Sequence, residues 1–161
     1  MKILTNKMTT MTDDYSDIRH ALCVSMGMMF ERVVEQKDLI DFSLHFFKSE
    51  VFKRYPDDWT IFSQSPLYVL QLFKEEIQET TGKSYDVLIK KNDKYEKDIA
   101  YWLGFLIIDW RVGYNFESSS LTRDNLIWLY LNYETLHTQS CKYVYEVFQE
   151  EKGQTFPDIQ M

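Results

Sequence analysis

Two aspartates in the most apolar stretch of the chain are the first residues that could carry chemistry. Asp98 and Asp109 are eleven residues apart, so on a helix over residues 94–113 they project at nearly the same azimuth. A rise of about 1.5 Å per residue separates them by roughly 16 Å, too far for either kind of glycosidase carboxylate pair. Asp109 has apolar neighbours, and a buried carboxylate needs hydrogen-bond donors. We therefore favour a structural partner such as Arg111, Arg123 or a tyrosine hydroxyl over catalysis.

Histidine and cysteine occur in two close pairs. His20 with Cys23, and His137 with Cys141, are spaced i,i+3 and i,i+4, so each pair can share one helix face. Together they supply the two cysteines and two histidines of a zinc site, but structural zinc sites usually contain a close cysteine pair. Cys141 and the nearby His137 could also act as a nucleophile and its base. We favour the interpretation that Cys141 is an inert cysteine. We expect no metal and no cofactor, and these four residues are the alternative ligand set.

The short motifs that mark common enzymes are absent from the sequence. It contains no Walker loop, no GxGxxG dinucleotide-binding pattern, no HExxH metalloprotease motif and no GxSxG nucleophile elbow. We therefore expect a protein that is not an enzyme and has no catalytic residues. An enzyme or zinc-binding protein that uses Asp109 or the four histidine and cysteine residues is the alternative from a different class.

Composition predicts a single all-α domain. The chain has 161 residues, near the usual size of one domain, and only five glycines and three prolines for tight turns. Eleven Phe, eleven Tyr and four Trp supply a large core. Two distant cysteines and no apolar N-terminal targeting segment predict a cytoplasmic protein without a structural disulfide. The expected architecture is a single bundle of about six helices.

The net charge narrows the class of partner. A formal charge of −7 disfavours an extended nucleic-acid surface, because phosphate contacts depend on Lys and Arg. An acidic domain is better suited to a basic partner, although the same charge also serves simply to keep proteins soluble. We expect no direct nucleic-acid contact and no membrane contact.

The bundle is expected to form around a central helix over residues 94–113, which Asp93 caps. It is apolar nearly all round, yet too short and interrupted to span a bilayer, which needs about 20 apolar residues. Gly104 within it would let a neighbouring backbone approach closely. Residues 85–89 read equally as a strand or a helical turn. The other expected helices cover 14–35, 39–54 with a bend near Ser49, 66–81, 126–136 and 141–151.

The helical domain is expected to span residues 13–152. A disordered tail is expected over residues 1–12 and a frayed tail over residues 153–161. Partner-binding candidates are the acidic residues on wet helix faces and two aromatic residues in loops or at helix ends. They are Glu75, Glu76, Glu79, Glu146, Glu150, Glu151, Trp59 and Tyr114.

Several aromatic and polar segments carry a resemblance to a known family. Between Tyr101 and Tyr145 these are Tyr101-Trp102-Leu103-Gly104, Trp110, Glu117-Ser118-Ser119, Tyr133 and Leu136-His137-Thr138, with Phe47-Lys48-Ser49-Glu50 upstream. With these segments the chain resembles a family of small helical bacterial proteins that are encoded beside ADP-ribosyltransferase-like toxins. The resemblance implies an antitoxin or accessory component whose partner is a toxin.

These observations lead to one functional expectation and its alternatives. The expectation is a non-enzymatic, antitoxin-like inhibitor that docks an acidic helical surface on a partner protein, a toxin or a defence effector. The alternative of the same physical kind is a phage-encoded inhibitor of a bacterial defence nuclease, anti-CRISPR-like, whose acidic surface mimics nucleic acid.

Overall fold

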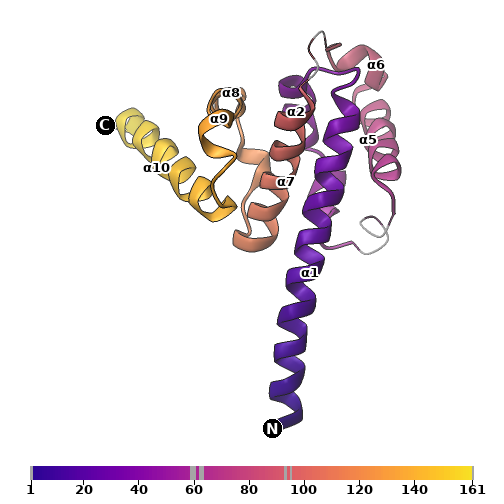
Figure 1. Cartoon of the computed structure of the whole chain (residues 1–161). Helices are drawn as coiled ribbons and strands as arrows, with labels where there is room; N and C mark the ends of the chain where they lie inside the picture. Colours follow the sequence, from indigo (N-terminus) through magenta and orange to yellow (C-terminus); the bar gives the residue numbers. More distant parts are fainter. Residues whose placement is uncertain (1, 59–60, 62–63, 93, 95, 161) are drawn as a thin grey trace.

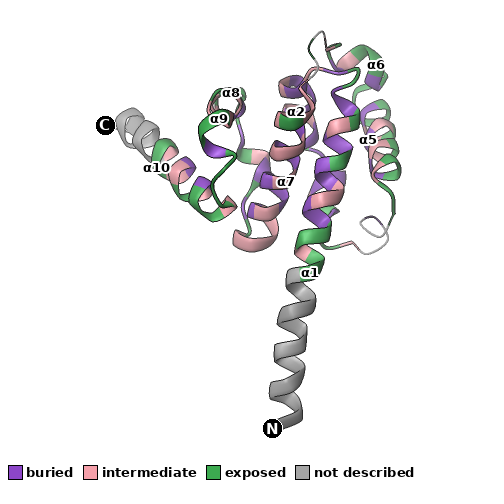
Figure 2. Cartoon of the chain, in the orientation of Figure 1, coloured by how far each residue is buried: buried purple, intermediate pink, exposed green. Residues whose placement is uncertain are grey.

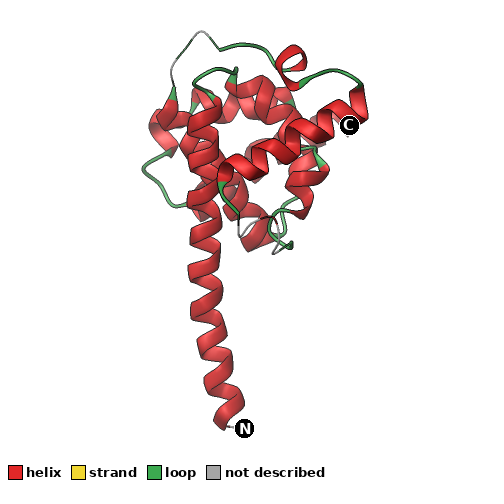
Figure 3. Cartoon of the chain, turned by 90° about the vertical axis from the view of Figure 1, so that its right-hand side faces the viewer, coloured by secondary structure: helices red, strands yellow, loops and turns green. Residues whose placement is uncertain are grey.

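The fold is all-α, as the sequence predicts. The computed structural model describes the backbone of residues 2–58, 61, 64–92, 94 and 96–160, and the side chains of 17–58, 61, 64–92, 94 and 96–152. Within these residues there are nine α-helices, one 3-10 turn and no β-strand (Figure 3). None of the helices in this part of the chain has the length and apolarity that a bilayer crossing requires.

Figure 1 shows the arrangement of the helices. In chain order they are α1 (Lys2–Val33), α2 (Leu39–Phe46), α3 (Glu50–Arg54), α5 (Pro66–Thr81), α6 (Tyr85–Leu88), α7 (Lys97–Tyr114), the 3-10 turn η1 (Ser118–Ser120), α8 (Arg123–Leu131), α9 (Tyr133–Leu136) and α10 (Cys141–Gln160).

The central position of α7 is confirmed. It lies between α1 on one side and the C-terminal helices on the other, while α5 covers the opposite side of α1 (Figure 1). Leu106, Ile107 and Trp110 of α7 are fully buried, and buried positions line the facing side of α1 (Figure 2). The buried apolar side chains belong to one core cluster, so these helices pack as a unit.

Gly104 lies at a close crossing of α1 and α7, which confirms its predicted role. A Cβ atom added there would approach the Phe30 ring to 2.8 Å and the backbone oxygen of Met26 to 2.9 Å. Such distances are below van der Waals contact, so only glycine allows the two helices to pack at this separation.

Side-chain caps define the starts of the early helices. The carboxylate of Asp38 accepts a hydrogen bond from the Asp41 amide at the start of α2, and Ser65 caps α5 in the same way. The predicted bend at Ser49 is a complete break. Ser49 Oγ donates to the Phe46 carbonyl and accepts from the Phe52 amide, so it ends α2 and starts α3.

Two expected elements are corrected, and one that the sequence left open is decided. Helix α7 begins at Lys97 and not at residue 94, with Glu96 in the N-cap position, and Asp93 lies outside the described residues. The helix expected over residues 126–136 is two helices, because the backbone leaves the helical conformation at Asn132, the C-cap of α8, with φ −100° and ψ 10°. The Asn132 side chain donates to the Trp128 carbonyl at this break. Residues 85–89 contain the helical turn α6 and no strand.

The first and last helices are longer than expected. No glycine or proline occurs before Gly27, so the sequence contains nothing that stops α1 upstream of residue 14. Helix α10 likewise continues past residue 151 to Gln160. The side chains of residues 1–16 and 153–161 are outside the described set, so the disordered and frayed tails stay predictions.

Candidate functional site: an acidic and aromatic groove along α7

Asp109 is paired within the protein. Arg19 of α1 donates from Nε to Oδ1 at 2.8 Å and from Nη2 to Oδ2 at 2.9 Å, a bidentate ion pair. The expected structural partner is therefore present, but the two named arginines are wrong: Arg111 donates to the Lys53 carbonyl, and Arg123 approaches Asp41 at 3.5 Å. Asp109 faces α1, and its partner Arg19 lies ninety residues earlier in the sequence. The ion pair gives Asp109 a structural role.

The guanidinium of Arg19 also lies against an aromatic ring. Its Cζ atom is 5.6 Å from the centre of the Tyr114 ring, and that ring stacks on Tyr145 at 4.5 Å. The hydrogen bond to Asp109 is the largest cause that raises the pKa of Arg19. Tyr114, a predicted docking residue, is therefore half-buried in an internal arrangement of carboxylate, arginine and aromatic ring.

Asp98 lies on the same face of α7, three turns before Asp109, and is exposed. The face between the two aspartates carries Tyr101, Trp102 and Phe105, and together with Asp98 these residues form one wall of a groove of about 580 Å³. Helix α1 contributes Glu31 to the groove. The far wall comes from α9, α10 and their connection: Tyr133, His137, Gln139 and Cys141.

The groove continues past the start of α7 into a second hollow of about 400 Å³. The two hollows share Asp98 and Tyr133, and the second adds the carboxylates of Glu96 and Glu134. Among the residues that line either hollow, Lys97 is the only Lys or Arg, and its ammonium lies 3.3 Å from Glu35. The lining is thus acidic and aromatic.

The rings in the groove are held by one another. Trp102 meets Tyr133 edge to face at 5.4 Å, and His137 stacks on Tyr133 at 4.4 Å. Tyr101 lies beside Phe105 with the ring centres 6.1 Å apart. These contacts preorganise the aromatic walls, which lowers the entropy that a bound side chain must lose.

The tyrosines report a negative potential along the groove. Burial raises the pKa of Tyr101 and of Tyr133, and the carboxylates add to it: Glu31 for Tyr101, Asp98 and Glu134 for Tyr133. A cation placed in the groove would experience the same carboxylates as an attraction.

The four histidine and cysteine residues do not form a metal-binding cluster. His20 packs against Phe105 at 5.8 Å, and His137 and Cys141 line the groove itself. Within the part of the chain that the structure describes, no three His, Cys, Asp or Glu side chains converge to hold a metal ion. Burial raises the pKa of the Cys141 thiol to about 12 and also raises that of the Cys23 thiol. A raised thiol pKa is the opposite of what an activated nucleophile or a metal ligand requires.

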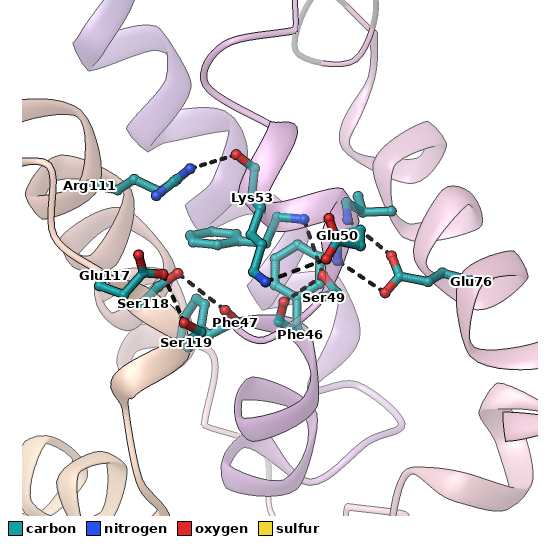
Figure 4. A network of polar contacts seen from close by, with 12 residues as sticks. Phe46, Phe47, Ser49, Glu50, Lys53, Glu76, Arg111, Glu117, Ser118 and Ser119 are labelled. Carbon is teal, nitrogen blue, oxygen red and sulfur yellow. Dashed lines mark hydrogen bonds and ion pairs between the residues drawn. The ribbon is translucent and has the colours of Figure 1, made fainter. Parts of the chain in front are cut away.

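The acidic residues predicted on α5 divide into two kinds. Glu75 and Glu79 are exposed, whereas Glu76 accepts hydrogen bonds from the backbone amides of Glu50 and Val51, each at 3.0 Å (Figure 4). Glu76 therefore caps α3 and is not a free recognition residue. On α10, Glu146, Glu150 and Glu151 are exposed, and Trp59 lies outside the described residues.

Two segments that carry the family resemblance meet in the structure. Ser118 Oγ donates to the Phe47 carbonyl at 3.1 Å, and Ser119 Oγ donates to Glu117 beside it (Figure 4). Ser118 is fully buried. Ser49, in the other segment (residues 47–50), is the N-cap of α3. The polar residues of these segments thus join α2 and α3 to the turn after α7, which is a structural task.

Sequence reasoning identified Asp98 but missed most of the groove. Asp98, Trp102 and Phe105 are spaced i, i+4 and i+7, a pattern that marks one helix face and could have suggested an acidic and aromatic stripe. Glu31 and Glu134 come from other helices, and no local pattern connects them to Asp98.

No protein-family model, curated protein or solved structure matches the chain. The resemblance to the family encoded beside ADP-ribosyltransferase-like toxins therefore stays a prediction.

Proposed function

We propose that the protein is a non-enzymatic, antitoxin-like inhibitor that binds a basic segment of a partner protein in the groove along α7. The observation that carries the proposal is the groove itself, in which carboxylates from α1, α7 and α9 surround preorganised aromatic rings. Aromatic residues in a concave surface supply binding energy, and complementary charge supplies orientation and encounter rate.

The size of the groove indicates a segment and not a whole domain surface. A volume of about 580 Å³ accommodates a few side chains. The lining offers acceptors for cationic groups and rings for their aliphatic or planar parts, so a basic helix or loop of the partner fits its chemistry. The exposed glutamates on α5 and α10 would then extend the negative field that steers the encounter.

Peptide selection tests this proposal and does not require an identified partner. A display library of random peptides is selected against the wild-type protein, and the peptides recovered are measured in solution against two charge-reversed variants. The groove variant carries Glu31→Lys and Asp98→Lys. The matched control carries Asp57→Lys and Asp124→Lys, at exposed positions outside the groove and with the same change in net charge.

We expect the selected peptides to be basic and to contain apolar residues, with binding that weakens as salt is added. Binding should be lost in the groove variant and retained in the control, while both variants keep the wild-type circular dichroism and melting behaviour. Selected peptides without basic character, or equal loss of binding in both variants, would show that the groove is not a docking site for a basic segment.

A further inference from the structure

The ion pair of Arg19 shows how this protein binds a guanidinium group. Two oxygens of Asp109 accept two hydrogen bonds from Arg19, and the Cζ atom of the guanidinium lies over the Tyr114 ring, 5.6 Å from its centre. A second ring, Tyr145, supports the first from behind. The arrangement combines a carboxylate in the plane of the cation with an aromatic face next to it.

Asp98 has a comparable setting on the same face of α7. Its carboxylate borders Tyr101, Trp102 and Tyr133 in the groove, and His137 supports the Tyr133 ring as Tyr145 supports Tyr114. Two further carboxylates flank it, Glu31 in the first hollow and Glu134 in the second. Unlike Asp109, Asp98 makes no ion pair with any Lys or Arg in the described part of the chain.

We infer that the groove recognises an arginine side chain, with Asp98 as the hydrogen-bond acceptor and the rings of Trp102 and Tyr133 as the stacking surface. The inference deepens the proposed function and rests on it, since it assigns the arginine to the partner's basic segment. Residues Glu31 and Glu134 add attraction from the two sides of the groove.

The chemistry of the lining selects arginine over lysine. A guanidinium is planar and weakly hydrated, so it stacks on rings and loses little solvation in a half-closed groove. It also presents parallel donors that match the two oxygens of one carboxylate. A lysine ammonium is compact and strongly hydrated, so it would gain from the carboxylates but make little use of the aromatic walls.

The test uses three short capped peptides that differ in one side chain. They are acetyl-Gly-Xaa-Gly-amide with Xaa as arginine, lysine or citrulline, the last being the uncharged counterpart of arginine. Binding to the full chain is followed by nuclear magnetic resonance, with the amides of residues 98 and 133 and the indole of Trp102 as reporters. The arginine peptide should bind several-fold more tightly than the lysine peptide, and the citrulline peptide should cause no saturable shift.

Variants then separate the carboxylate from the ring. Asp98→Asn should weaken the arginine peptide by about tenfold or more, because a charged hydrogen-bond acceptor is lost. The matched control Asp124→Asn, at an exposed aspartate in the first turn of α8 outside the groove, should leave it unchanged. Tyr133→Leu should weaken it by about two- to fivefold, and Tyr133→Phe should restore it, because stacking requires the ring and not the hydroxyl. Melting curves confirm that each variant is folded.

The possible failures have different meanings. If the lysine peptide binds as tightly as the arginine peptide, or if Asp98→Asn binds arginine like the wild type, the inference is wrong while docking of a basic segment can stand. If no peptide produces a saturable shift in the groove, arginine recognition at Asp98 is also wrong. The docking proposal itself fails only if the peptide selection yields no groove-dependent basic peptide.

Discussion

The crossing of α1 and α7 offers a sharp test of the packing that supports the groove. Gly104→Leu introduces a branched side chain where even a Cβ would lie 2.9 Å from the Met26 carbonyl and 2.8 Å from the buried Phe30 ring. The backbone of α1 cannot move aside alone, because the same face of α1 packs along α7. The two helices must therefore separate or the Phe30 ring must leave its place in the core.

The magnitude follows from two opposing effects. Replacing glycine inside a helix by leucine gains up to about 1 kcal/mol of helix propensity. Overpacking a well-filled core costs about 1–3 kcal/mol or more, and a leucine at a site without room for a methyl group belongs at the upper end. The net loss should be at least about 2 kcal/mol, which for a domain of this size lowers the melting temperature by about 4–8 °C.

Thermal melting by circular dichroism and urea denaturation measure this loss. Gly27→Ala is an informative comparison at the same crossing, since the three atoms nearest to its Cβ would all belong to the half-exposed ring of Tyr101. This ring can shift more easily than a helix backbone, so we expect a much smaller effect. Gln71→Leu on the exposed face of α5 controls for added surface apolarity and should change stability by no more than about 0.5 kcal/mol. If the Gly104→Leu variant has the same melting temperature as the wild type, the close helix crossing is refuted.

Four further outcomes are expected. Glu76→Ala should lower the free energy of unfolding by about 1 kcal/mol in urea titrations, because two α3 amides lose their acceptor, while Glu75→Ala should not change it. Burial, followed by the hydrogen bond to Glu96, raises the pKa of Tyr130 from 10.0 to about 12. The neutral Tyr130 side chain therefore contributes stability that is fully present below pH 10 and is lost as the pH rises towards 12. Tyr130→Phe should flatten the plot of unfolding free energy against pH in this range. Cys141, with its pKa raised to about 12, should react with a thiol reagent at neutral pH far more slowly in the folded protein than in urea, and fast reaction of the folded protein would contradict the assigned environment. Chelators should leave the melting temperature unchanged, and stoichiometric zinc with a large loss of stability in chelator would overturn the expectation that no metal is bound.

Local sequence chemistry determined most of the secondary structure. Ser65 followed by Pro66 starts α5, and Gly82 ends it with a left-handed φ of 74°, because these residue types favour those conformations whatever the rest of the chain does. The long apolar stretch around Trp110 could lie only in the interior, so the central helix was predictable as well.

Local sequence patterns did not predict the break between α8 and α9. Asn132 divides the helix expected over residues 126–136, although leucines and aromatic residues continue the helical period through it. The break lies in the backbone conformation of Asn132, with φ −100° and ψ 10°, accompanied by its side-chain hydrogen bond to the Trp128 carbonyl, and periodicity reports neither.

The partners of the charged residues were decided by the tertiary structure alone. Arg19, Arg111 and Arg123 were all available to Asp109, and the crossing of α1 with α7 selected Arg19. The groove has the same origin, since Glu31 and Asp98 come from separate helices whose side-by-side packing is a property of the whole core. A sequence determines which helices form and which faces are buried through short-range preferences, whereas the meeting of distant polar side chains follows from how those buried faces pack.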